Sequence, residues 1–189
     1  MKDSQQGHKK SLIFLTGFMG SGKSTIGPIL ANTLGFQYLD VDQHIEQKAN
    51  KRVAEIFSSD GEQVFRALER EALLELTERN HCVISLGGGT IANEENCQLV
   101  LQKGILIYLK LSPDEIIQRV QYRSDRPMLK DEHGKQLTPP ELKNRVLDLM
   151  NRREKFYARA DVVITADNMR VGATVDEIMK NIHFMVDKE

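Results

Sequence analysis

The sequence has almost no net charge, few cysteines and no long apolar run. Its 26 Lys and Arg nearly balance 27 Asp and Glu, so its charge favours neither nucleic acid nor an anionic membrane as a partner. No apolar run approaches the roughly 20 residues that span a bilayer, and the polar residues 1–10 lack the apolar core of a signal peptide. Cys82 and Cys97 have no metal-ligand spacing. We therefore expect a cytoplasmic protein with reduced thiols that binds neither nucleic acid nor membrane.

The remaining composition is that of an ordinary globular protein. Of the 189 residues, 40% are hydrophobic and 28% are charged, which is enough for one domain with a sizeable core. We interpret residues 1–10 as a flexible tail and residues 11–189 as a single domain.

Residues 17–25 match G-x-x-x-x-G-K-[ST], the phosphate-binding P-loop. An apolar run at 11–16 predicts a strand before the loop, and apolar residues at helical spacing follow it. The loop glycines allow positive φ, so that free N–H groups can point toward phosphate oxygens. Lys23 supplies a charge for the β- and γ-phosphates, and the Ser24 hydroxyl is placed to bind Mg²⁺. A glycine-rich turn without a ligand is the weaker alternative. The predicted nucleotide-binding residues are Gly20, Ser21, Gly22, Lys23, Ser24 and Thr25.

Short apolar strands alternate with amphipathic helices along the rest of the chain. Further strands are expected at 36–41, 83–86, 105–109 and 161–165. Helices are expected at about 42–50, 61–80 and 93–102, after 112, after 138 and up to about 186. Each predicted helix cap is followed three residues later by Gln or Glu; these caps are Asp60, Ser112, Thr138 and Thr174. The alternation predicts one α/β domain with a parallel sheet covered by helices on both faces.

Several polar residues have both a structural and a functional interpretation. Asp42 could cap the helix after the strand at 36–41, or it could lie with Asp40 at the carboxyl edge of the sheet, where α/β folds bind ligands. The neighbouring P-loop favours the second interpretation. Glu69 falls on an apolar helix face three residues after Arg66. Taken alone, this helix favours a solvated ion pair; the alternative is that Glu69 holds Arg66 rigid to grip an anionic substrate.

Three further regions leave the same choice open. The glycine run 87–89 is either a flexible loop or a place where a ligand touches the main chain. Arg153 lies on the apolar stripe of the helix after 138, whereas Arg152 points away. A buried arginine needs an anion, which could be an internal carboxylate or a ligand. Residues 123–138 lack periodicity and are locally basic, so they form either a solvated loop or a lid over a polyphosphate.

The chain resembles the shikimate kinase family of small P-loop kinases, over about residues 12–184. The P-loop itself is shared by many families. The more specific features are the Asp40 and Asp42 pair, Gly61-Glu62 followed by Phe65-Arg66 and Glu69, the run Gly87-Gly88-Gly89, and Arg126-Pro127.

The resemblance implies a single-domain P-loop kinase fold with five parallel strands in the order 2-3-1-4-5 and a mobile lid at about 123–138. It implies an enzyme that transfers the γ-phosphoryl group of ATP, with Mg²⁺, to the 3-hydroxyl of shikimate in aromatic amino acid (chorismate) biosynthesis. We expect this enzyme to be a monomer. The implied catalytic residues are Lys23, Asp42 and Arg126, and Arg119 and Arg126 would also contact the nucleotide. The implied shikimate-binding residues are Asp42, Arg66, Gly87, Gly88, Gly89 and Arg153. Ser24 would bind the metal, with Asp40 acting through water.

Two positions depart from the expected pattern. Pro28 lies inside the first predicted helix, where it removes the bond to the Ser24 carbonyl and predicts a bend. The family commonly has proline two residues after the arginine that corresponds to Arg153, and this chain has Lys155. We therefore expect the helix to continue through Lys155, and Arg152 is an alternative ligand. The competing functions are another small P-loop kinase, acting on gluconate or a nucleoside monophosphate, and a nucleotide-binding module without turnover. The combination of Lys23, Ser24, Asp42 and Arg126 argues against the module.

Overall fold

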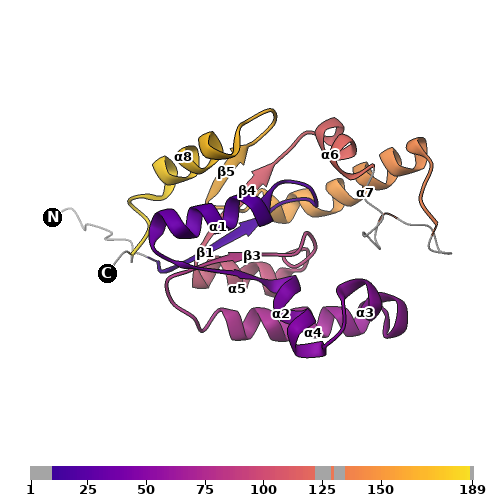
Figure 1. The fold of residues 1–189 in the computed structure, drawn as a ribbon, viewed down its shortest axis with the longest axis horizontal. Coiled ribbons are helices and arrows are strands. Elements are labelled where there is room, and N and C mark those ends of the chain that lie inside the picture. Colours follow the sequence, from indigo (N-terminus) through magenta and orange to yellow (C-terminus); the bar gives the residue numbers. More distant parts are fainter. Residues whose placement is uncertain (1–9, 122–128, 130–134, 188–189) are drawn as a thin grey trace.

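The computed structural model describes residues 10–121, 129 and 135–187, and within these ranges it contains a five-stranded parallel sheet (Figure 1). Its strands are β1 (Leu12–Thr16), β2 (Gln37–Asp40), β3 (Cys82–Ser85), β4 (Ile105–Lys110) and β5 (Val162–Thr165). Their order is β2-β3-β1-β4-β5, with β1 paired to β3 on one side and to β4 on the other. The predicted α/β fold and strand order are confirmed.

Helices cover both faces of this sheet (Figure 1). They are α1 (Lys23–Leu34), α2 (Val41–Ala49), α3 (Val53–Ser59), α4 (Gly61–Leu76), α5 (Glu94–Lys103), α6 (Pro113–Val120), α7 (Pro139–Tyr157) and α8 (Val171–Ile182). On one face, Leu30 of α1 and Ile178 of α8 pack with Leu15 of β1. On the other face, Phe14 packs with Leu73 of α4 and with residues of α5. Successive residues of β1 therefore point into two separate cores, which is why the strand is apolar throughout.

Two of the predicted helix caps are confirmed, and both involve residues only three positions apart. Ser112 Oγ accepts a hydrogen bond from the Glu115 N–H at 3.3 Å, and Thr138 forms a capping box with Glu141. Helix α7 continues past Lys155 to Tyr157, as expected. None of the described helices is both long enough and apolar enough to cross a membrane.

Two predicted caps are wrong. Asp60 precedes α4, but its side chain makes no capping bond and instead pairs with Lys51 at 2.8 Å. Helix α3, which the sequence analysis missed, runs directly into this junction. Thr174 lies within α8, which begins at Val171, and its hydroxyl donates to the Arg170 carbonyl.

Candidate active site

The P-loop connects the central strand β1 to α1. Gly17, Gly20 and Gly22 have φ values of 146°, 83° and 97°, as the sequence predicted. At Gly17 the need for glycine is also steric, because an added Cβ would lie 2.6 Å from the Leu109 carbonyl oxygen on β4. The loop therefore lies directly against the neighbouring strand and leads into the N-terminus of α1, where anions bind favourably.

Lys23 is folded back over this loop. Its Nζ donates to the Gly17 carbonyl at 2.8 Å and to the Phe18 carbonyl at 3.2 Å. These carbonyl oxygens hold the ammonium beside the place where phosphate oxygens would enter. Ser24 and Thr25 are exposed at the first turn of α1.

A cavity of about 370 Å³ lies over the loop. It is lined by Met19, Gly20, Gly22, Lys23, Ser24, Thr25, Asp40, Asp42, Ser85, Leu86, Gly87, Gly88 and Arg119. The carboxyl ends of β1, β2 and β3 thus bring the P-loop, the acidic pair and the glycine run to one edge of the sheet. The hydroxyl of Ser24 and the carboxylate of Asp40 are hard oxygen donors of the kind Mg²⁺ takes alongside water and phosphate, so these residues fit the predicted metal.

The two aspartates have different surroundings. Asp40 accepts a hydrogen bond from the Gln43 N–H at 3.1 Å and caps α2, so the cap is Asp40 and not Asp42. Asp40 also accepts from the Tyr38 hydroxyl at 3.3 Å. Burial, together with the Asp40 charge, raises the pKa of Tyr38 to about 12, so its hydroxyl remains a donor. Asp42 lies in the first turn of α2 and lines the cavity.

A second, smaller cavity of about 90 Å³ adjoins the first. The two cavities share Met19, Asp42, Gly87 and Gly88. The second adds Val53, Phe57, Phe65, Arg66, Glu69, Gly89 and Arg153. Asp42 therefore lies where a nucleotide-sized space meets a small pocket that is lined by two arginines and two aromatic rings.

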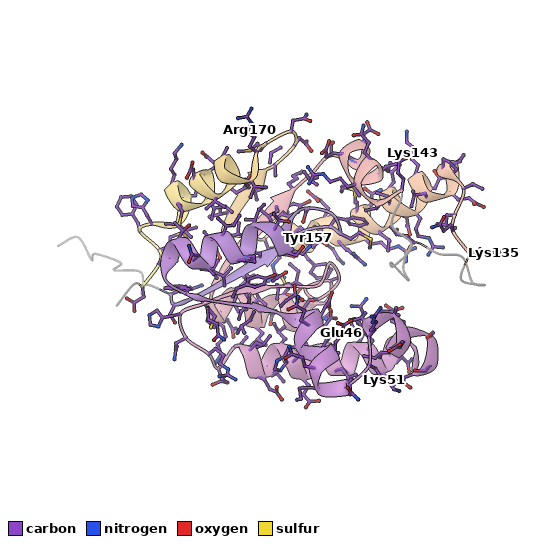
Figure 2. The ribbon with its side chains drawn as sticks, viewed as in Figure 1. Glu46, Lys51, Lys135, Lys143, Tyr157 and Arg170 are labelled. Atoms are coloured by element: carbon purple, nitrogen blue, oxygen red, sulfur yellow. The ribbon has the colours of Figure 1, made fainter. Side chains whose placement is uncertain are left out.

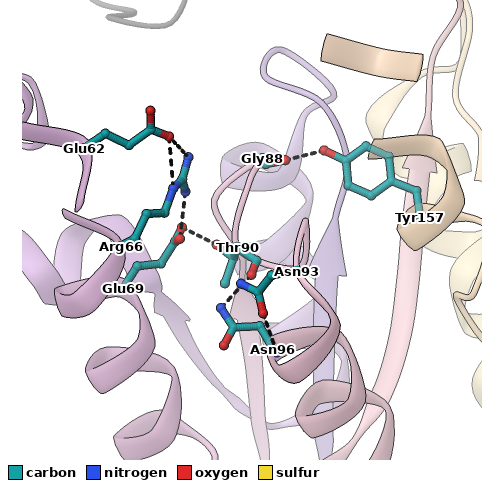
Figure 3. Close-up of polar contacts among 8 residues, drawn as sticks. All are labelled: Glu62, Arg66, Glu69, Gly88, Thr90, Asn93, Asn96 and Tyr157. Atoms are coloured by element: carbon teal, nitrogen blue, oxygen red, sulfur yellow. Dashed lines mark hydrogen bonds and ion pairs between the residues drawn. The ribbon is translucent and has the colours of Figure 1, made fainter. Parts of the chain in front are cut away.

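Arg66 is fixed on one side of this pocket by carboxylates (Figure 3). Its Nη1 lies 2.8 Å from Glu69 Oε2, and its Nη2 lies 3.0 Å from Glu62 Oε1. Glu69 is only 1% exposed, so the interpretation of a solvated pair is wrong. The guanidinium also lies against Gly89, where an added Cβ would come within 2.9 Å of Nη1.

Arg153 lines the same pocket from α7 and is 6% exposed. Its guanidinium carbon lies 5.5 Å from the centre of the Phe18 ring, and in the part of the chain that the structure describes it has no ion pair with a carboxylate. The next residue, Arg152, is exposed and pairs with Asp148 at 3.0 Å. The structure thus places Arg153 at the pocket and Arg152 away from it.

Tyr157 is the last residue of the same helix and lies near the centre of the molecule (Figure 2), where it contacts the glycine run (Figure 3). Its hydroxyl donates to the Gly88 carbonyl, and its ring is buried against Tyr108. Burial raises the pKa of Tyr157 above its ordinary value, against the opposing effect of the Arg153 charge. The hydroxyl therefore keeps its proton and remains a donor.

Arg119 links the P-loop to α6. Its Nη1 donates to the Gly20 carbonyl at 3.0 Å, and its Nε donates to Glu115 at 2.9 Å. It also lines an adjoining cavity of about 140 Å³ with Ala166, Met169, Val171 and Thr174. The sequence analysis missed this segment between β5 and α8, which carries no motif. Arg126 and most of the predicted lid lie outside the described residues.

A sequence model described as "Shikimate kinase" matches residues 19–183. The shikimate kinase of Chlorobium limicola is 48% identical over 91% of this chain and 86% of its own, and that of Chlorobaculum tepidum is 46% identical over 91% and 90%.

The solved structures agree with this result. A shikimate kinase from Acinetobacter baumannii in complex with shikimate has a TM-score of 0.83 and 32% identity, and covers 92% of this chain and 93% of its own. The enzyme from Bacteroides thetaiotaomicron has a TM-score of 0.82 and 31% identity, over 91% and 98%. The chain belongs to the shikimate kinase family.

Family membership confirms several predictions made from the sequence. The chain is an ATP-dependent phosphotransferase with an alcohol group as acceptor, and it uses Mg²⁺. Neither a gluconate kinase nor a binding module without turnover fits relatives of this identity and coverage.

Proposed function

We propose that the chain transfers the γ-phosphoryl group of ATP to the 3-hydroxyl of shikimate across the junction of the two cavities. The observation that carries the proposal is the place of Asp42, which lines both cavities. A base there reaches an acceptor hydroxyl in the smaller pocket while the hydroxyl faces the phosphates over the P-loop. Phosphoryl transfer needs mainly this positioning and charge neutralisation.

The proposed nucleotide site is the larger cavity with its extension toward α8. Residues 20–25 surround the phosphates at the N-terminus of α1, and Lys23 exchanges its contacts with the loop carbonyls for β- and γ-phosphate oxygens. Ser24, with Asp40 through water, would hold Mg²⁺, which supplies charge neutralisation at the phosphates when bound. The adenine ring of the nucleotide lies in the 140 Å³ cavity between Arg119 and the segment before α8. Arg126 remains a proposed contact of the transferred group.

The proposed acceptor site is the smaller pocket. Arg66 and Arg153 bind the carboxylate of shikimate, and the ring lies against the glycine run 87–89. Asp42 accepts the proton of the attacking hydroxyl as its oxygen bonds to the γ-phosphorus, and the bond from that phosphorus to the bridging oxygen breaks to release ADP. A monomeric, cytoplasmic enzyme remains a prediction.

Asp42→Asn tests this proposal because it keeps the shape of the side chain and removes its charge. Since Asp42 acts mostly in the transition state, we expect kcat to fall about 10²- to 10⁴-fold, with KM for shikimate within about threefold. Coupled measurement of ADP release, with shikimate, quinate and gluconate as acceptors, gives both constants.

The matched control is Asp148→Asn, which alters an exposed aspartate on α7 that pairs with Arg152. It should leave both constants unchanged. A folded Asp42→Asn enzyme with normal kcat would remove Asp42 from the reaction. Turnover of gluconate without turnover of shikimate would overturn the proposed acceptor.

A further inference from the structure

Glu69 is the most buried charged group in the acceptor pocket, and Arg66 satisfies only one of its two oxygens. Arg66 Nη1 contacts Oε2 at 2.8 Å. The other oxygen, Oε1, accepts a hydrogen bond from the Thr90 hydroxyl at 2.7 Å. Both contacts are drawn in Figure 3. A buried carboxylate is costly without such partners, so both contacts contribute to fixing its orientation.

Thr90 is itself held in place from α5. It is fully buried, and its main-chain carbonyl accepts a hydrogen bond from Asn96 Nδ2 at 2.8 Å. Asn96 is 2% exposed, and its main-chain N–H donates a hydrogen bond to Asn93 Oδ1 at 2.9 Å. Since the Thr90 hydroxyl has a single proton to donate, the donation to Glu69 depends on where this backbone lies.

Asn96 also ties the loop back to α4. Its Oδ1 accepts from Arg70 Nη1 at 2.8 Å, and Arg70 lies one helical turn after Arg66. The segment 87–96 is thus joined to α4 at two points, one between Thr90 and Glu69 and the other between Asn96 and Arg70. Both joints lie on the side of the pocket that carries Arg66.

We propose that Thr90 and Asn96 are positioning residues for the acceptor. They fix the Glu69 carboxylate, and Glu69 fixes the Arg66 guanidinium before shikimate binds. The inference rests on the proposed role of Arg66 in binding the shikimate carboxylate. A guanidinium that is already ordered does not lose its freedom on binding, so the arrangement increases affinity for shikimate without a direct contact to it.

Thr90→Val removes the hydroxyl and keeps the branched shape. We expect KM for shikimate to rise roughly fivefold, with kcat and KM for ATP within twofold, because only the acceptor arginine is loosened. Thr90→Ser restores the hydroxyl and should return KM to within twofold of the parent enzyme. An equal rise in the two Michaelis constants, or no rescue by serine, would overturn the proposal.

The matched control is Thr77→Val, at the C-cap of the helix that carries Arg66. Thr77 is also buried, and its hydroxyl donates to the Leu74 carbonyl at 2.7 Å. This variant should lower the melting temperature without changing either Michaelis constant. A rise in KM for shikimate here would mean that any loss of stability in α4 affects the pocket, which would overturn the specific role of Thr90.

A double-mutant cycle separates this inference from the proposed function. If Thr90 acts through Arg66, Thr90→Val should add less than twofold to KM for shikimate when it is introduced into Arg66→Lys. Additive effects would overturn the relay. If Arg66→Lys alone leaves this KM unchanged, the proposed acceptor site is wrong; if Arg66→Lys raises it and Thr90→Val does not, only the relay is wrong.

Asn96→Asp provides the same test should Thr90→Val fail to fold. It keeps a side-chain oxygen for Arg70 and removes the side-chain amide that donates to the Thr90 carbonyl. We expect roughly a threefold rise in KM for shikimate with KM for ATP unchanged. An unchanged KM for shikimate in this variant would overturn the proposal.

Discussion

Arg66 and Arg153 line the same small pocket from different helices, and their charges are balanced in different ways. Arg66 has two carboxylates of its own, Glu62 and Glu69, and its side chain is 31% exposed. Arg153 is more deeply buried, lies over the Phe18 ring, and has no ion pair with a carboxylate in the described ranges. Among the residues that the structure describes, one cation is therefore paired with carboxylates before any ligand arrives, whereas the other is not.

The difference indicates how the two arginines would share an anionic acceptor. A buried cation without a carboxylate gains most when a ligand supplies one. A cation already paired with two carboxylates gains less binding energy from the carboxylate of a ligand. Its contribution is instead an ordered geometry. We therefore expect Arg153 to provide more of the binding energy for shikimate and Arg66 to provide more of the orientation.

Of the substitutions in this pocket, Arg153→Lys should raise KM for shikimate the most. Lysine keeps the charge, but it loses the planar donors and the stacking on Phe18. We expect KM for shikimate to rise by about 3 kcal/mol, or roughly a hundredfold, in initial-rate measurements at saturating ATP. Arg152→Lys, one residue away and exposed, is the control and should change KM less than twofold. A smaller effect of Arg153→Lys than of Arg66→Lys would contradict the proposed division.

Arg66→Lys should cause the second-largest rise in KM for shikimate. The ammonium can pair with Glu69, but it cannot also present a second donor edge to the ligand. We expect KM for shikimate to rise by about 2 kcal/mol, or on the order of thirtyfold, while KM for ATP stays near normal. If KM for ATP rose and KM for shikimate did not, Arg66 would belong to the nucleotide site.

Tyr157→Phe should have the smallest effect. It removes the hydrogen bond to the Gly88 carbonyl, next to Arg153. We expect KM for shikimate to rise by about 1 kcal/mol, or roughly fivefold. Because burial raises the Tyr157 pKa above its usual value, the hydroxyl stays protonated. The ratio of KM for shikimate in Tyr157→Phe to KM for shikimate in the parent enzyme should thus be constant from about pH 7 to pH 9. This range lies below the unperturbed tyrosine pKa of about 10. A ratio that fell toward one within this range would show that the hydroxyl ionises.

The fold and the conformation of the P-loop could be predicted because their signals are contiguous in sequence. The P-loop needs nine successive residues, and its glycines have the positive φ values that the motif requires. The apolar strands are buried on both faces, so they stand out without alternation. Caps such as Ser112 and Thr138 depend on the next three residues alone, and both are right.

The features that were missed depend on partners far along the chain. Glu69 is buried because Thr90, 21 residues later, donates to it, and nothing in α4 alone indicates that partner. Thr174 has the spacing of a cap, but α8 begins earlier and without a side-chain cap. The nearby Asp167 instead accepts from the Ser112 N–H at 2.9 Å, a contact between distant segments. Helix α3 is short, and Ile56 is its single fully buried residue, which leaves little periodicity to detect.

The central place of β1 in the sheet links ligand binding to folding. The P-loop leaves a strand that has partners on both sides, β3 and β4, and these strands are far away in sequence. The loop is therefore in its binding shape only in chains that have completed this non-local pairing. A ligand that binds only this state, at 100 times its dissociation constant, adds about 2.7 kcal/mol to the free energy of unfolding. Nucleotide in the refolding buffer would thus raise the yield of correctly assembled sheet as well as occupy the site.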